Sequence, residues 1–157
     1  LIFLLTTRGI PQLYYGTEIL MTGDKEKGDG DLRKDFPGGW SGDGCNCFEA
    51  SGRTPLENEA FEFTRRLLNW RKGNSVIGKG TLKHYSLCQG VYVYQRELNG
   101  RSVVVMMNGT DSPKELDLTP YKEILPADNA RDVLTGNQVN LGEKILLEGR
   151  ENLVLEF

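Results

Sequence analysis

An Asn-Gly pair between two runs of strand-forming residues is the feature that most constrains the fold. The runs Val91 to Leu98 and Arg101 to Met107 are rich in β-branched and aromatic residues, and Asn99-Gly100 lies between them. Both residues of such a pair tolerate the positive φ angles of a two-residue hairpin turn. The second half of the chain is therefore predicted to contain antiparallel β-structure.

Further short segments with strand composition are separated by Gly, Pro and Asn. They are Thr81 to Leu87, Glu115 to Leu118, Arg131 to Leu134, Val139 to Leu141, Lys144 to Leu147 and Asn152 to Phe157. About eight short antiparallel strands are typical of a β-sandwich, because two packed sheets bury the alternating apolar residues. We therefore predict an antiparallel β-sandwich over residues 79–157.

The first half of the chain has helical signals and one candidate strand. Leu1 to Thr7 predicts the end of a buried helix, which Arg8-Gly9 closes. Ile10 to Gly16 suits a short strand buried on both faces. Thr54-Pro55-Leu56-Glu57 has the form of a capping box with proline at the first helical position, and the apolar stripe after it predicts a helix from Pro55 to Lys72.

These elements predict an α+β chain in two parts, residues 1–78 and residues 79–157. A single strand with one and a half helices buries little surface alone, so we interpret the first part as the end of a larger α/β unit. The chain opens on an apolar run without Met, which we interpret as truncation. We expect partial disorder or self-association through residues 1–16, because a strand without neighbours exposes unpaired backbone groups.

Residues 22–53 form a long glycine-rich segment without a helical or strand period. Connections of more than about 15 residues in a compact domain are usually either functional or disordered. Both interpretations stay open, and this segment is where we expect a site.

Composition excludes several classes of partner. The net charge of −3 lacks the basic footprint that nucleic-acid binding needs. Leu1 to Leu5 is the longest apolar stretch and is far shorter than the roughly 20 residues that span a bilayer, so no membrane partner is expected. Cys45 and Cys47 have the spacing of neither a zinc knuckle nor a redox pair, and we interpret them as packed or inert thiols.

Two motifs resemble a known enzyme family. The run from Gly9 to Glu18, GIPQLYYGTE, resembles the eighth barrel strand of the α-amylase family of glycoside hydrolases. The segment from Arg33 to Trp40, RKDFPGGW, is similar to the corresponding loop of bacterial neopullulanases and cyclomaltodextrinases, particularly periplasmic starch-utilisation enzymes. The resemblance implies that residues 1–78 are the C-terminal end of a (β/α)8 catalytic barrel (strand 8, long loop, helix 8) and that residues 79–157 are domain C.

The resemblance also implies a function for the full-length parent, namely hydrolysis of α-1,4-glucosidic bonds in pullulan, cyclodextrins or maltooligosaccharides with retention. Retaining glycosidases need two carboxyl groups only about 5 Å apart. The family's catalytic carboxylates would lie upstream of Leu1, so the chain itself is predicted to be inactive and to need no cofactor; calcium in the parent is left open. The resemblance favours a periplasmic location and leaves a cytoplasmic one open. Whether the parent transfers the glucosyl group to water or to another sugar also stays open.

The long loop would lie on the active face of such a barrel and supplies the substrate-binding candidates. An aromatic ring can lie against the apolar face of a pyranose, while Arg and Asp bond to hydroxyl groups. The alternative is that the aromatic residues only pin the loop to the barrel and the arginine pairs with an acid. The candidates are Arg33, Asp35, Phe36 and Trp40.

Other acidic residues favour a structural role. Glu18 ends the presumed barrel strand, where we expect a hydrogen-bond acceptor rather than a catalytic group. A further acidic run invites a calcium interpretation, but interleaved lysines and an irregular spacing favour a solvated charge run, so no metal site is expected. This run is Asp24, Glu26, Asp29 and Asp31.

A rival function from another class is a non-catalytic carbohydrate-binding or interaction module. In this alternative Tyr85, Tyr92 and Tyr94 would form an aromatic platform on the sandwich. Because Tyr92 and Tyr94 are two residues apart on one strand, their side chains share a face. Packing between strands is the other use of such aromatic residues.

Overall fold

The computed structural model describes residues 1–157, which divide into two compact units. Unit 1 comprises residues 1–10 and 67–157, and unit 2 comprises residues 11–66. The helix α3, Pro55–Gly73, contributes residues to both units. A division into domains at residue 78 stays a prediction, because compact units and domains need not share a boundary.

The chain is α+β, with helices first and antiparallel strands afterwards, as the sequence predicts. The helical elements are α1 (Ile2–Thr6), η1 (Thr17–Ile19), η2 (Lys25–Lys27), α2 (Asp29–Leu32), η3 (Ala50–Gly52), α3, α4 (Ser75–Lys79) and η4 (Thr119–Ile124). The strands are β1 (Thr81–His84), β2 (Val91–Leu98), β3 (Arg101–Asn108), β4 (Lys114–Asp117), β5 (Asn129–Asp132), β6 (Gln138–Asn140), β7 (Lys144–Leu147) and β8 (Asn152–Glu156).

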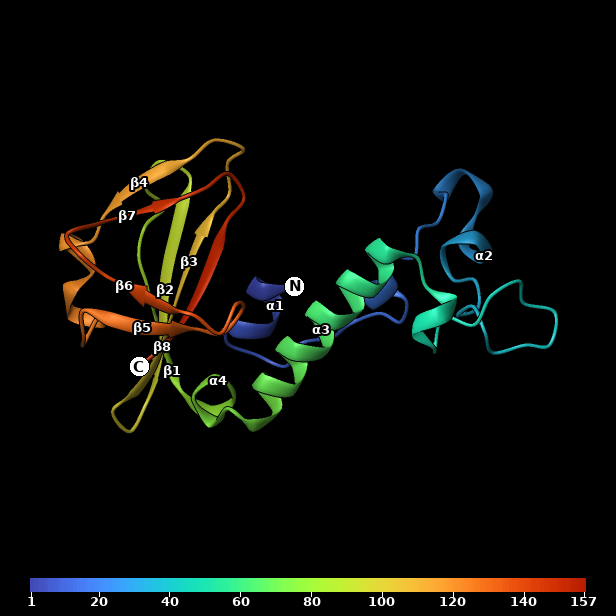
Figure 1. The fold of residues 1–157 in the computed structure, drawn as a ribbon, viewed down its shortest axis with the longest axis horizontal. Helices are drawn as coiled ribbons and strands as arrows, with labels where there is room; N and C mark the ends of the chain where they lie inside the picture. Colours follow the sequence, from blue (N-terminus) through green and yellow to red (C-terminus); the bar gives the residue numbers. More distant parts are fainter. The chain divides into compact units, whose positions relative to one another are not determined.

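Unit 1 contains two antiparallel sheets (Figure 1). The larger has six strands in the order β1-β2-β3-β8-β5-β6, and β4 pairs with β7 in the smaller. Residues Asn99 and Gly100 join β2 to β3 with φ angles of 54° and 79°, which is the backbone that a type I′ hairpin turn requires. The turn sets the register in which Val93 faces Met106.

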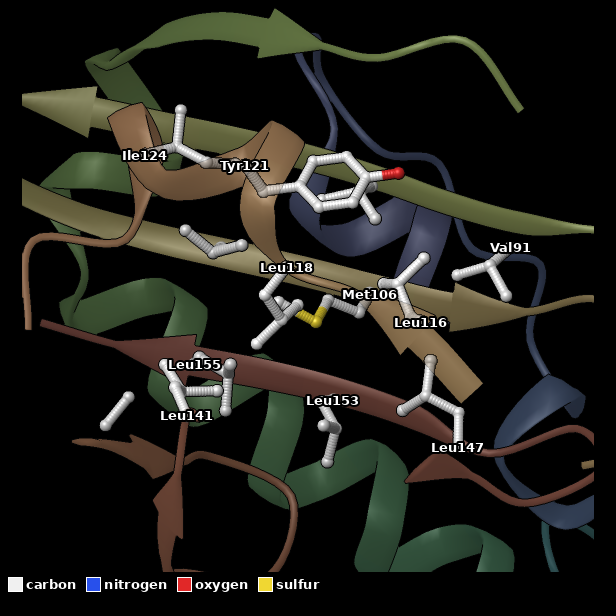
Figure 2. Close-up of a cluster of buried hydrophobic side chains, with 13 residues drawn as sticks. Val91, Met106, Leu116, Leu118, Tyr121, Ile124, Leu141, Leu147, Leu153 and Leu155 are labelled. Atoms are coloured by element: carbon white, nitrogen blue, oxygen red, sulfur yellow. The ribbon is translucent and has the colours of Figure 1, made fainter. Parts of the chain in front are cut away.

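The main core of unit 1 lies between the two sheets. Alternate residues of β2, β3 and β8 meet residues of β4, β7 and η4 there, as Figure 2 shows for Met106 and Leu118. The η4 segment, which sequence patterning did not predict, supplies Tyr121 and Ile124. The buried residues of this core are Val91, Val93, Val104, Met106, Leu116, Leu118, Tyr121, Ile124, Ala130, Leu141, Leu147, Leu153 and Leu155.

The strand residues that alternate with this core are also buried, because short helices pack beside the large sheet. Helix α4 packs against β2 and β3. On these strands Tyr94, Val103 and Val105 are buried, and α1 is buried on one side through Ile2 and Leu5. The large sheet is therefore covered on both faces.

Arg96 of β2 links α1 to the sheet. Its side chain is 2% exposed, and all of its hydrogen bonds go to backbone carbonyl oxygens. Nη1 donates to Thr6 (3.0 Å) and Thr7 (2.9 Å), Nη2 to Gly80 (2.8 Å), and Nε to Thr81 (3.0 Å). Burial, and then the nearby cation of Arg71, lowers the pKa of Arg96. The guanidinium satisfies carbonyl groups that the end of a helix leaves unpaired.

The predicted strand over Ile10 to Gly16 does not form. The segment has no ladder partner within residues 1–157, and a strand needs a neighbour to bond its backbone groups. Gly16 instead has a φ of 84° and leads into η1. The predicted buried helix at the start of the chain is confirmed on one side of α1, where Ile2, Leu5 and Thr6 are buried. Self-association stays a prediction.

None of the helices combines the length and hydropathy that a membrane-spanning helix needs.

Substituting Arg96 tests the bond between α1 and the sheet. Arg96→Met keeps the volume of the side chain but leaves four carbonyl groups without their donor, and we expect a loss of about 3 kcal/mol in the free energy of unfolding. Arg101→Met, at an exposed position of the neighbouring strand, should change it by less than about 0.5 kcal/mol. Urea denaturation measures both. Equal stabilities for the two variants would contradict the role given to Arg96.

Two glycine substitutions test the hairpin turn with opposite expected signs. Gly100→Ala places a side chain at a φ of 79° and should destabilise the protein by about 1 kcal/mol. Gly78→Ala lies inside α4, where an added Cβ meets no atom within 4 Å, and should stabilise by about 0.5 kcal/mol. Thermal denaturation measures both, and stabilisation by Gly100→Ala would contradict the assigned turn.

Candidate functional site

The predicted site segment in unit 2 is closed into a compact loop by short-range hydrogen bonds. The carboxylate of Asp43 accepts from the amides of Gly38 (2.6 Å) and Trp40 (3.1 Å). The carbonyl of Pro37 accepts from the amide of Cys47 (3.0 Å). These bonds draw the two arms of residues 36–48, hereafter the aromatic loop, against each other.

Arg53 fixes the end of the aromatic loop to helix α3. Nη1 donates to the carbonyls of Cys47 (2.8 Å) and Phe48 (3.3 Å), and Nε donates to Oδ1 of Asn58 (2.9 Å). The guanidinium also lies 3.8 Å from the ring centroid of Phe61. Such a cation–π contact adds about 0.5–1 kcal/mol at an exposed site. Arg53 therefore connects the end of the aromatic loop to the first turns of α3.

The start of α3 has the predicted capping box. The amide of Thr54 donates to Oε2 of Glu57 (2.7 Å), and the amide of Glu57 donates to Oγ1 of Thr54 (3.3 Å). These reciprocal bonds satisfy amides that the first turn of a helix leaves unpaired. The helix that anchors Arg53 thus begins at a defined residue.

Trp40 and Phe36 differ in their surroundings. The ring of Phe36 packs against that of Phe48 at 4.6 Å between centroids, and Phe36 is only half-buried. Trp40 is 68% exposed, although its backbone amide is held by Asp43. Phe36 therefore packs within the loop itself, whereas the indole of Trp40 is open to solvent.

The polar candidates Arg33 and Asp35 lie on the exposed side of the same segment. Arg33 Nη2 forms an ion pair with Asp29 at 3.2 Å, and both side chains are mostly exposed. The hydroxyl of Tyr15 donates to the carbonyl of Arg33 (3.0 Å), which fixes the backbone there. An exposed pair contributes about 0–1 kcal/mol, so a ligand can recruit the Arg33 side chain at little cost. Asp35 is exposed.

The acidic run 24–31 is used in local contacts. Asp24 accepts from the amide of Glu26 (2.9 Å) and lies 3.6 Å from Lys27 Nζ, while Asp31 accepts from the amide of Asp24 (2.5 Å). No group of three or more His, Cys, Asp or Glu side chains is arranged to hold a metal ion. Glu18 lies in η1 rather than at the end of a strand.

The three tyrosines of unit 1 do not form a common platform. Tyr94 is fully buried, and its hydroxyl lies 2.5 Å from that of Thr6. Tyr85 packs edge-on against Tyr121 of the core and donates to Glu123 (2.6 Å). Burial, and then this bond, raises the pKa of Tyr85 to about 12. Tyr85 and Tyr92 are both half-buried and keep part of their surface accessible.

Comparisons with known proteins place this fold. Residues 82–156 match the family described as "Cyclo-malto-dextrinase C-terminal domain". The chain is 33% identical over 136 residues to the cyclomaltodextrin glucanotransferase of Niallia circulans, covering 87% of this chain and 16% of the relative. Residues 82–156 are a C-terminal domain of the α-amylase family.

A second curated relative and a solved structure agree with this assignment. An α-amylase of Niallia circulans is 29% identical over 142 residues, covering 88% of this chain and 23% of the relative. An α-amylase of Geobacillus thermoleovorans, solved with acarbose, has a TM-score of 0.70 at 22% identity and covers 98% of this chain and 31% of that one. The chain thus spans less than a third of each of these relatives.

The candidate residues lie before the matched domain. Arg33, Asp35, Phe36 and Trp40 share one loop segment of unit 2. Sequence reasoning missed Asp43, Phe48 and Arg53, which hold the aromatic loop. Arg53 directly precedes the capping box, and that position is the one signal that could have indicated an anchor.

Removing the Arg53 anchor should loosen the aromatic loop. Arg53→Gln loses the bonds to Cys47 and Phe48 and the contact with Phe61, so we expect proteolytic cleavage between residues 36 and 53 to be about tenfold faster. Arg65→Gln, which removes an exposed ion pair with Glu62 on the same helix, is the matched control and should leave cleavage unchanged. Limited proteolysis with mass spectrometry of the products measures the rates. Equal rates in both variants would contradict the anchor.

Proposed function

We propose that this chain is the C-terminal part of an α-glucan enzyme of the neopullulanase and cyclomaltodextrinase type. The parent would cleave α-1,4-glucosidic bonds with retention, using carboxylates that this chain does not carry. Two findings support the proposal. Residues 82–156 match a cyclomaltodextrinase C-terminal domain, and the chain aligns with only 16% of a related glucanotransferase. The contribution of this part is structural and substrate-binding.

The aromatic loop is the proposed substrate contact. The observation that carries this proposal is the exposed indole of Trp40 on a backbone held by Asp43 and Pro37. A rigidly placed ring can lie against the C–H face of a glucose unit without a large ordering cost. Arg33 and Asp35 lie in the adjoining exposed segment and can bond to hydroxyl groups. Phe36 supports the loop through its contact with Phe48.

A second candidate for the parent is a transglycosylase. The relative at 33% identity is a cyclomaltodextrin glucanotransferase, and transfer to a sugar shares the covalent retaining route with hydrolysis. The acceptor, water or sugar, is chosen outside this chain. Product analysis after incubation with maltooligosaccharide decides between them, because transfer yields longer or cyclic glucans.

The binding-module alternative is tested at Tyr92, because Tyr85 packs against Tyr121 and donates its hydroxyl to Glu123. Phe3 and His84 lie beside it, each with its ring centroid 6.2 Å from that of Tyr92. Maltoheptaose binding by the isolated chain that is lost in Tyr92→Ala would favour this alternative. Binding that survives Tyr92→Ala would exclude it.

Trp40 provides the direct test in the full-length enzyme. Trp40→Ala removes one ring–sugar contact, and we expect KM for maltooligosaccharide to rise about tenfold while kcat changes less than about threefold. Trp70→Phe is the matched control, because the Trp70 indole donates to Glu156 (2.7 Å) in unit 1 and should leave both constants unchanged. Steady-state kinetics measures both. An unchanged KM in Trp40→Ala would contradict the proposed contact.

A further inference from the structure

Two cysteines of the aromatic loop lie close together and differ in accessibility. The sulfur atoms of Cys45 and Cys47 are 3.7 Å apart. Cys45 is exposed, whereas Cys47 is 3% exposed. The third thiol, Cys88, is exposed in unit 1. Cys45 and Cys47 are therefore the two thiols that the fold of unit 2 holds side by side.

The backbone around this pair is fixed on the Cys47 side. The amide of Cys47 donates to Pro37, and its carbonyl accepts from Arg53. Between the cysteines, Oδ1 of Asn46 accepts from the amide of Phe48 (3.1 Å) and holds the turn. A disulfide needs its sulfurs about 2 Å apart, so the approach falls to the exposed Cys45 side chain, which can rotate.

We propose that Cys45 and Cys47 form a reversible intramolecular disulfide by exchange with a low-molecular-weight disulfide such as oxidised glutathione. The Cys45 thiol loses its proton to solvent, and the thiolate attacks one glutathione sulfur, which forms a mixed disulfide and releases one glutathione thiolate. Cys47 then loses its proton, attacks the Cys45 sulfur and releases the second thiolate. The protein loses two hydrogens, and the oxidised glutathione becomes two reduced molecules.

The order of the two steps follows from access and acidity. Burial, and then a hydrogen bond with Cys45, raises the pKa of the Cys47 thiol, so it is the poorer nucleophile toward an external disulfide. Its weak bond to the carbonyl of Gly52 (3.5 Å) keeps its sulfur beside Cys45. In the second step the closeness of the two sulfur atoms compensates for the raised pKa of Cys47, because its attack on the Cys45 sulfur is intramolecular.

The bond would cross-link the turn from Cys45 to Cys47, beside the Cys47 backbone that bonds to Pro37 and Arg53. An exposed disulfide of short span is of the labile class, which is why the exchange is reversible. Its formation requires no glucan, so the inference is independent of the proposed substrate contact and is tested without a sugar.

The experiment is peptide mass spectrometry of the whole chain after graded exposure to oxidised glutathione, with an acidic quench and removal of glutathione before trypsin digestion at neutral pH. We expect the peptide Asp35 to Arg53 to become lighter by two hydrogen atoms and to regain its mass with dithiothreitol. In Cys47→Ser a stable glutathione adduct should accumulate on Cys45. In Cys45→Ser, modification of Cys47 should be at least about tenfold slower, because that thiol is buried. Cys88→Ser is the matched control and should oxidise normally.

Two outcomes would overturn the inference. One is a lasting glutathione adduct on Cys45 in the chain without substitutions, which would show that Cys47 does not displace the glutathione. The other is equal adduct formation on Cys45 and Cys88 with no internal bond at any glutathione ratio. Far-ultraviolet circular dichroism of each variant separates these outcomes from unfolding.

Discussion

The buried guanidinium of Arg96 is the interaction on which the arrangement of unit 1 depends. It lies on the face of β2 opposite the main core and donates to the end of α1, to Gly80 and to Thr81. Without it, four carbonyl groups would lose their donor, and such groups are costly when buried. Arg71 complements it by donating to the carbonyls of Leu5 and Gly9. Two cations therefore complete the C-terminal end of one short helix.

The two units are stabilised by different kinds of interaction. Unit 1 has a continuous apolar core between two sheets, whereas the aromatic loop of unit 2 is held by Asp43, Arg53 and backbone bonds. Polar contacts near the surface stabilise less than apolar burial, so the loop is expected to open more readily than the sheets. A loop that presents an exposed ring from a fixed backbone fits substrate contact, and its two thiols offer a way to change its stiffness.

Local signals determined which elements the sequence could predict. The Asn99-Gly100 turn and the Thr54–Glu57 capping box depend on neighbouring residues, and both form as predicted. The strand over Ile10 to Gly16 failed because strand pairing depends on distant partners. The η4 segment was missed since its burial of Tyr121 is decided by the opposite sheet.

The same distinction applies to the candidate site. Trp40 and Phe36 could be named from an aromatic composition within a glycine-rich segment. The different exposures of these two side chains could not be predicted, because Phe48 lies twelve positions after Phe36 and contacts it only in the closed loop. Arg53 was missed for a similar reason, since its acceptors in the loop are the backbone carbonyls of Cys47 and Phe48, which carry no signal in a sequence.

Peptide mass spectrometry of the native gene product is the most direct test of the account, reading the residues that precede Leu1. An α-glucan enzyme parent predicts an Asn-His-Asp motif a few tens of residues before Leu1, with further barrel strands ahead of it. A native chain that starts at or near Leu1 would contradict the account and would leave the binding-module alternative.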